Sequence, residues 1–148
     1  MQSINKKEII ILYNSVDYFM SEIEKRGYII SELYRHESLL SRFLRKLFNK
    51  FSINERLLFG KWKNHLKSSK YIIVFATVDI KILQYIKSVN PEIKIIYWYW
   101  NPAYRIGRPT KELYELTDIW TFDKNDAKNY NLKYNNTFYF DTIFSESS

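Results

Sequence analysis

Three side chains that can accept a proton follow short apolar runs of this chain: Asp17, His36 and Asp79. A carboxylate or an imidazole acts as a general base when it lies within hydrogen-bond reach of a hydroxyl group and has a suitable pKa. Each of the three also has a simpler interpretation, as a helix cap or a surface residue. We take them as the candidate catalytic residues, of the kind that activates a hydroxyl nucleophile.

Aromatic, amide and cationic side chains gather after the apolar run at residues 93–100. Aromatic faces suit the C–H faces of a carbohydrate, and an Arg guanidinium binds phosphate or carboxylate groups through paired hydrogen bonds. The two arginines of this stretch are equally compatible with solvated loop charges. With the amide that follows the first apolar run, these side chains form the candidate ligand-binding set: Asn14, Trp100, Asn101, Tyr104, Arg105 and Arg108.

Four aromatic residues in a row end that apolar run. Alternation along a strand sends Tyr97 and Tyr99 to one face and Trp98 and Trp100 to the other. We therefore assign the first three rings to the core, where they pack on flanking helices. Trp100 lies nearest the carboxyl end of the strand, and its role as core or as ligand contact stays open.

Asp123 and Asp126 have the spacing of a DxxD metal-binding pattern. The same spacing places Asp123 at the N-cap of a helix and Asp126 in its electropositive first turn. We favour the capping interpretation, and we predict no metal site.

Short apolar runs alternate with helical patterns along most of the chain. The predicted strands are residues 8–13, 28–34, 71–76, 93–100, 119–122 and 138–143. This alternation is typical of a Rossmann-like α/β fold, with a mostly parallel sheet of about six strands and helices on both faces. We expect one domain over residues 1–144 and a frayed tail over 145–148. Ligands of such sheets bind at the carboxyl ends of the strands, where the candidate residues fall.

A basic helical insertion over residues 37–67 interrupts the alternation. Residues 35–70 hold ten of the 23 Lys and Arg residues and two of the 16 Asp and Glu residues. The net charge of this segment is therefore larger than the net charge of the whole chain, which is +7. An apolar stripe over residues 39–51 has four cations opposite it: Arg42, Arg45, Lys46 and Lys50. A second helix is predicted from Asn54 through Gly60, with Trp62 and Leu66 on its inner side.

The basic stripe has three interpretations. It packs on the sheet, it docks on an anionic bilayer with its cations at headgroup level, or it contacts nucleic acid. The Leu and Phe side chains favour lipid over nucleic acid, because phosphate binding does not require them. Nucleic acid is therefore the least favoured of these partners.

The composition excludes several classes of site. Without cysteine, the chain has no disulfide, thiol nucleophile or cysteine-ligated zinc. Its three glycines, Gly27, Gly60 and Gly107, are too far apart for a phosphate-binding glycine loop, so we expect no nucleotide cofactor and no other cofactor. We also see no signal peptide and no apolar run of about 20 residues. The expected location is cytoplasmic, with peripheral attachment to the inner face of the membrane.

Two stretches of the sequence resemble a known family. They are residues 90–102, which include IIYWYWNP, and residues 120–135, which include WTFDKNDA and YNLKYN. Both resemble the N-terminal halves of bacterial GT-B-like glycosyltransferases of lipopolysaccharide and capsular polysaccharide biosynthesis. The resemblance covers roughly half of the chain.

This resemblance implies that the chain is the acceptor-side domain of such an enzyme. Its partners would be a glycan or lipid-linked glycan acceptor and a donor-binding domain or subunit, and no metal would be needed for transfer. We also expect the chain to stop where a donor domain would begin. The alternatives are a non-catalytic binding or scaffold module that pairs with a separate donor subunit, and a basic nucleic-acid-binding protein.

Overall fold

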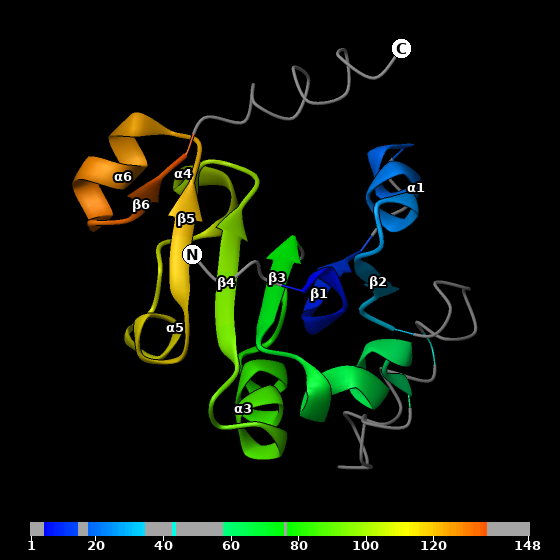
Figure 1. Ribbon diagram of the computed structural model, residues 1–148. Helices are drawn as coiled ribbons and strands as arrows, with labels where there is room; N and C mark the ends of the chain where they lie inside the picture. Colours follow the sequence, from blue (N-terminus) through cyan, green and yellow to red (C-terminus); the bar gives the residue numbers. More distant parts are fainter. Residues whose placement is uncertain (1–4, 15–17, 35–42, 44–57, 76, 136–148) are drawn as a thin grey trace.

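The computed structural model describes residues 5–14, 18–34, 43, 58–75 and 77–135. Its strands form one parallel sheet with the order β2-β1-β3-β4-β5-β6 (Figure 1). The strands are β1 (Ile9–Tyr13), β2 (Ile29–Glu32), β3 (Tyr71–Phe75), β4 (Lys94–Tyr99), β5 (Asp118–Thr121) and β6 (Lys133–Tyr134).

Apart from η1, which precedes β1, the helices lie in the connections between these strands, because a parallel neighbour is reached only by a crossover that returns the chain to the same end of the sheet. The helices are η1 (Lys6–Glu8), α1 (Tyr18–Lys25), η3 (Lys61–Ser68), α3 (Ile80–Val89), α4 (Ala103–Ile106), α5 (Lys111–Leu116) and α6 (Lys124–Tyr130), with η1 and η3 in the 3-10 form. The Rossmann-like α/β fold predicted from the sequence is therefore confirmed.

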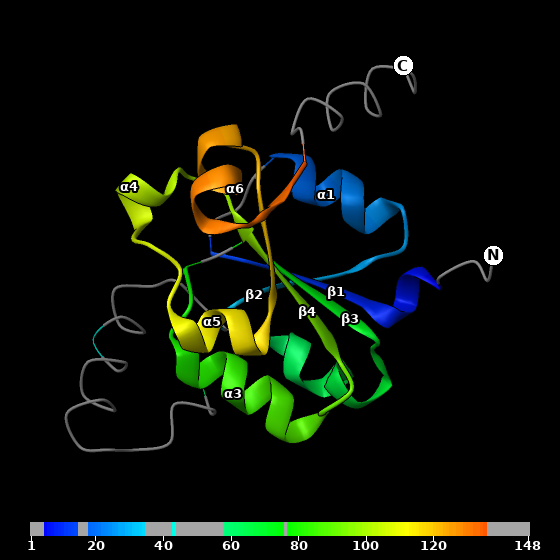
Figure 2. The same ribbon diagram turned by 90° about the vertical axis from the view of Figure 1, so that its left-hand side faces the viewer.

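The two faces of the sheet have separate cores, since side chains alternate along each strand. On one face, strand residues pack on η3, α3 and α5. Its buried residues include Ile10, Leu12, Ile72, Val74, Trp62, Leu66, Leu83, Ile86 and Leu113. On the other face, Ile11 packs with Met20 and Ile23 of α1. Figure 2 shows α1 across the sheet from α3 and α5, so helices cover both faces as predicted.

Side-chain caps begin three of the helices, and the sequence predicts two of these caps, Asp79 and Asp123. The Asp79 carboxylate accepts a hydrogen bond from the N–H of Lys81 at 2.9 Å, and the Thr110 hydroxyl accepts one from Leu113 at 3.3 Å. Asp123 accepts hydrogen bonds from the first turn of α6. These side chains satisfy N–H groups that have no partner inside their own helix.

The prediction of a helix running through Gly60 is wrong. Gly60 has extended backbone angles, φ −60° and ψ −178°, and Phe59 forms an isolated antiparallel bridge with Tyr34. A Cβ on Gly60 would lie 2.0 Å from the carbonyl oxygen of Glu32. Glycine is therefore needed for a close approach of this segment to β2, and the helix begins only at Lys61.

The sixth strand also differs from its prediction. It is β6, a two-residue strand that pairs with β5, while the predicted strand at residues 138–143 lies outside the described residues. β6 was missed because Lys133 and Tyr134, both exposed, carry no apolar strand pattern.

Candidate functional site

The strand order reverses between β1 and β3, and the ligand site of a doubly wound sheet lies at the carboxyl ends of such strands. Asn14 follows β1, and its side-chain N–H donates to the carbonyl of Thr77, after β3, at 3.4 Å. The two loops of the switch point are thus tied to each other. Asn14 lies where the sequence placed it, with its amide nitrogen engaged by this contact.

The candidate bases fare differently in the structure. The exposed Asp79 lies beside Thr77, but its carboxylate caps α3. Asp17 and His36 lie outside the described residues. The geometry therefore accounts for Asp79 as a cap, and the catalytic assignment of all three stays a prediction.

The loop after β4, residues 100–108 (the β4 loop), presents an exposed aromatic and cationic surface. Trp100 is 43% exposed and Tyr104 is 80% exposed. The Arg105 guanidinium carbon lies 5.7 Å from the centroid of the Tyr104 ring, within cation–π range. Asn101 and Arg108 are exposed on the same loop. The structure therefore places five of the six candidate ligand-binding residues together on one loop.

Trp100 also links the β4 loop to β3. Its ring meets Phe75, the last residue of β3, edge-on at 5.9 Å between centroids. The other three aromatic residues of β4 are buried, with Tyr97 and Tyr99 in the core under α3 and Trp98 against Phe75 on the opposite face. The predicted division of these rings is confirmed.

Two hydrogen bonds anchor the backbone of the β4 loop. The carboxylate of Asp126 on α6, a residue only 8% exposed, accepts a hydrogen bond of 2.6 Å from the N–H of Ala103 at the start of α4. The hydroxyl of Tyr99 donates to the carbonyl of Gly107 at 3.2 Å. Burial raises the pKa of Tyr99 far above its ordinary value, so the hydroxyl remains a donor.

The sequence predicts the role of Asp123 in the DxxD pattern, but not the contact that Asp126 makes with Ala103. Asp123 is the N-cap, accepting from Asn125 at 2.7 Å and from Asp126 at 3.1 Å, as predicted. The hydrogen bond that Asp126 accepts from the N–H of Ala103 joins residues far apart in sequence, so no local pattern predicts it. The sequence offers one signal, an acid in the first turn of a short helix, and only the structure shows that this acid is buried.

A hollow of about 450 Å³ lies at the carboxyl ends of β1 and β2. We call it the β1–β2 hollow; it is lined by Tyr13, Ile30, Ser31, Glu32, Tyr34, Gly60 and Lys61. Burial, together with the charges of Glu32 and Glu24, raises the pKa of Tyr13. Sequence reasoning missed this site because Glu32 fell inside a predicted strand and Lys61 inside a predicted helix.

The basic stripe is almost wholly outside the described residues, as are Arg42, Arg45, Lys46 and Lys50. Phe43 is the stripe residue that the structure describes, and it is 58% exposed. Its exposure argues against complete burial of the stripe. In the described ranges, every helix is too short or too polar to cross a membrane.

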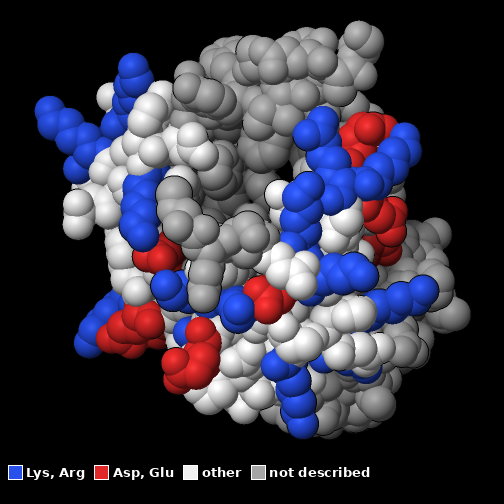
Figure 3. All heavy atoms as spheres, viewed as in Figure 1, with Lys and Arg blue, Asp and Glu red and all other residues white. Residues whose placement is uncertain are grey.

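The charged side chains of the face drawn in Figure 3 are mixed in sign. On α1, Lys25 pairs with Glu22 at 2.5 Å, and near the start of β3 Lys70 pairs with Glu8 at 3.0 Å. Such exposed pairs contribute little to stability, and they dilute any single-sign field on this side.

No protein-family model matches this chain, and no curated protein matches it.

Proposed function

We propose that this domain binds a glycan acceptor at the carboxyl edge of its sheet, as the acceptor-side domain of a glycosyltransferase of bacterial surface polysaccharide biosynthesis. The observation that carries the proposal is the β4 loop. It presents an exposed indole, phenol and guanidinium at the edge where doubly wound sheets bind ligands. The resemblance of residues 90–102 and 120–135 to such enzymes includes Trp100 and Asn101 at the start of this loop, and its Asp126 anchor.

The chemistry of the β4 loop suits an acidic or phosphorylated sugar. Trp100 and Tyr104 offer flat faces to the C–H groups of a sugar ring. Arg105 and Arg108 add guanidinium groups, which pair with carboxylate or phosphate oxygens in two parallel hydrogen bonds. A lipid-linked glycan carries both features, a sugar ring and a phosphate.

A platform for recognition must hold its shape before the ligand arrives. Asp126 and Tyr99 form hydrogen bonds with the backbone at the two ends of α4. The exposed side chains of the loop therefore belong to an anchored backbone. Binding an acceptor there would then order few further groups. This supports a binding site in preference to a surface loop without function.

Transfer itself needs groups beyond this site. Asp17, His36 and Asp79 remain the candidate bases, and the sugar donor would be held by a further domain or a separate subunit. The proposed place of action is the cytoplasmic face of the membrane, where residues 39–51 would dock. The exposure of Phe43 supports that docking.

The test is an NMR titration of the chain with trigalacturonate as an acidic oligosaccharide and maltotriose as a neutral one. We expect trigalacturonate to bind more tightly, and Trp100→Ala and Arg105→Gln each to weaken binding about tenfold, which corresponds to about 1.4 kcal/mol. Tyr134→Ala is the matched control, because Tyr134 on β6 is also 43% exposed. Equal affinity of Trp100→Ala and Tyr134→Ala would refute the proposal.

A further inference from the structure

We propose that the β1–β2 hollow is a second sugar subsite, which takes a neutral polyhydroxylated ring of the same acceptor. This inference rests on the proposed function and deepens it. With one sugar at the β4 loop and another in the hollow, the acceptor would be an oligosaccharide lying across the carboxyl edge of the sheet.

The size of the hollow fits a small polar ligand. Its volume of about 450 Å³ falls within the range of roughly 300–1,000 Å³ that is usual for ligand pockets. Two tyrosines, Tyr13 and Tyr34, are among the residues that line it. Aromatic walls beside polar groups are the combination that a sugar ring requires, since the ring has C–H faces and hydroxyl edges.

The charged groups of the lining specify a neutral ligand. Glu32 and Lys61 both line the hollow, and among the described residues neither forms an ion pair. A carboxylate only accepts hydrogen bonds and an ammonium only donates them, while a sugar hydroxyl does both. A phosphate would meet the negative charges of Glu32 and Glu24, which are close enough to raise the pKa of Tyr13.

The walls of the hollow are fixed before any ligand binds. The N–H of Gly60 donates to the carbonyl of Leu33 at 3.0 Å, and the indole of Trp62 donates to the same carbonyl at 2.9 Å. The backbone N–H of Trp62 donates to the hydroxyl of Ser31 at 3.3 Å. These bonds hold the start of η3 against β2, so the backbone of Lys61 stays at the hollow that Glu32 also lines.

The hollow and the β4 loop lie at the same edge of the sheet. β2 and β4 are separated by three strand intervals in the order β2-β1-β3-β4, which is about 14 Å at the usual strand spacing. The switch point, where Asn14 contacts Thr77, lies between them. A glycan of a few residues can therefore reach both sites across the position where the strand order reverses.

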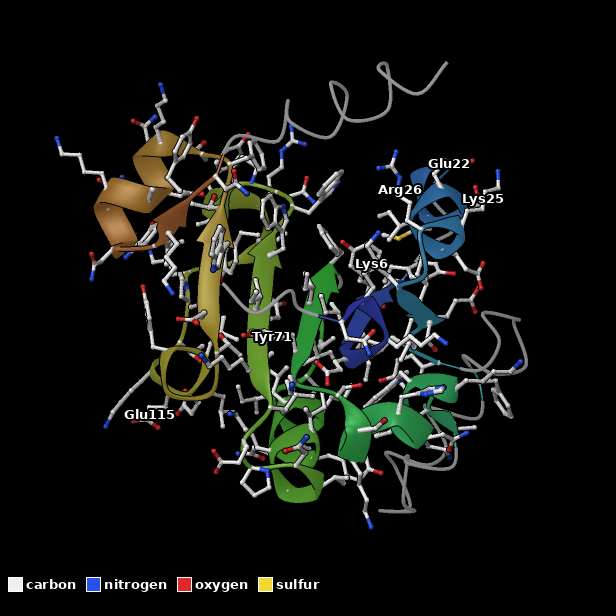
Figure 4. The ribbon with its side chains drawn as sticks, in the orientation of Figure 1. Lys6, Glu22, Lys25, Arg26, Tyr71 and Glu115 are labelled. Atoms are coloured by element: carbon white, nitrogen blue, oxygen red, sulfur yellow. The ribbon has the colours of Figure 1, made fainter. Side chains whose placement is uncertain are left out.

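The test is an NMR titration with five neutral monosaccharides: glucose, galactose, mannose, rhamnose and N-acetylglucosamine. We expect at least one of them to shift the amide signals of Ser31, Glu32 and Gly60 in a saturable way. Glu32→Gln should weaken that binding about tenfold, because a hydrogen bond to a charged group contributes more than a neutral one. Glu115→Gln is the matched control, since Glu115 on α5 lies far from β2 (Figure 4).

Three results would overturn the inference: no shift at these amides with any of the five sugars, equal affinity of the two variants, or tighter binding of inorganic phosphate than of every sugar. Thermal unfolding checks that Glu32→Gln is folded. If it is not, Lys61→Gln at an exposed position replaces it, with a several-fold loss of affinity expected.

The amide signals of Trp100 and Tyr104 in the trigalacturonate titration, compared with the amide signals of the hollow in the monosaccharide titrations, separate the two proposals. A response of the β4 loop to trigalacturonate without a response of the hollow to any sugar overturns this inference alone. If the amide signals of the β4 loop do not shift with trigalacturonate, the proposed function is overturned.

Discussion

The carboxylate of Asp126 on α6 accepts a hydrogen bond of 2.6 Å from the backbone N–H of Ala103 on α4. The bond is buried, and it joins the helix after β5 to the loop after β4. A buried N–H must find a partner, and a carboxylate is the strongest acceptor that a side chain offers. Asp126 therefore fixes the loop that carries the candidate acceptor-binding residues.

Replacing Asp126 tests this relationship. Asp126→Ala should lower the free energy of unfolding by about 2–3 kcal/mol, because it leaves the N–H of Ala103 buried without its acceptor. Asp126→Asn keeps an acceptor oxygen and should lose less. Urea unfolding measures both variants. Asp123→Ala, which removes only the N-cap, should cost about 1 kcal/mol and leave trigalacturonate binding unchanged. Equal glycan affinity of Asp126→Ala and Asp123→Ala would contradict the anchoring role.

Two buried tryptophans allow a matched comparison of a hydrogen bond. The indole N–H of Trp62 donates to the carbonyl of Leu33, while that of Trp98 is buried with no acceptor among the residues that the structure describes. Trp62→Phe and Trp98→Phe remove the same atoms, but only Trp62→Phe removes a hydrogen bond to Leu33. We expect Trp62→Phe to be less stable than Trp98→Phe by about 1–2 kcal/mol in urea unfolding. The opposite order would show that ring packing outweighs the bond.

Alkaline pH should destabilise the protein through Tyr99. Its folded-state pKa is raised above the ordinary value of 10.0, chiefly by burial. Above pH 10 the unfolded chain releases the hydroxyl proton while the folded protein keeps it, so the free energy of unfolding falls as pH rises. One such group contributes at most about 1.4 kcal/mol per pH unit. Between pH 9 and 11, the free energy of unfolding should fall less with rising pH for Tyr99→Phe than for the native chain, as measured by urea unfolding at each pH. Identical pH dependence would exclude this role of Tyr99.

The chain should bind nucleotide-sugars poorly and transfer no sugar by itself. A glycine-rich phosphate loop is impossible with Gly27, Gly60 and Gly107 so far apart. Calorimetric titration with uridine and guanosine sugar nucleotides measures this directly. Tight binding would move the donor site into this domain.

Residues 39–51 should attach the domain to anionic membranes. Four cations near such a surface contribute about 1 kcal/mol each at low salt. Sedimentation with anionic vesicles should therefore exceed sedimentation with neutral ones. The double substitution Arg45→Glu with Lys46→Glu should abolish the difference, while Lys124→Glu with Lys128→Glu on α6 should not. Equal binding to both kinds of vesicle would dismiss the docking hypothesis.

Local patterns in the sequence determined the elements of this fold. Apolar runs of strand length predicted β1 to β5, and the caps Asp79 and Asp123 predicted where α3 and α6 begin. These features depend on neighbours a few residues away, through hydrogen bonds to the next turn and alternation along a strand. The assignment of the first three rings of β4 to the core is confirmed, while the 43% exposure of Trp100, which the sequence left open, is decided by the structure.

Only the tertiary structure decided the contacts that join distant segments. Gly60 reads locally as a weak helix residue, yet its place is set by the carbonyl of Glu32, which leaves no room for a Cβ. Asp126 reads locally as a first-turn acid, yet it holds Ala103 on another helix. Glu32 and Lys61 come to line one hollow only when η3 packs against β2. Such contacts depend on the order of strands in the sheet, which the pattern along any one segment does not contain.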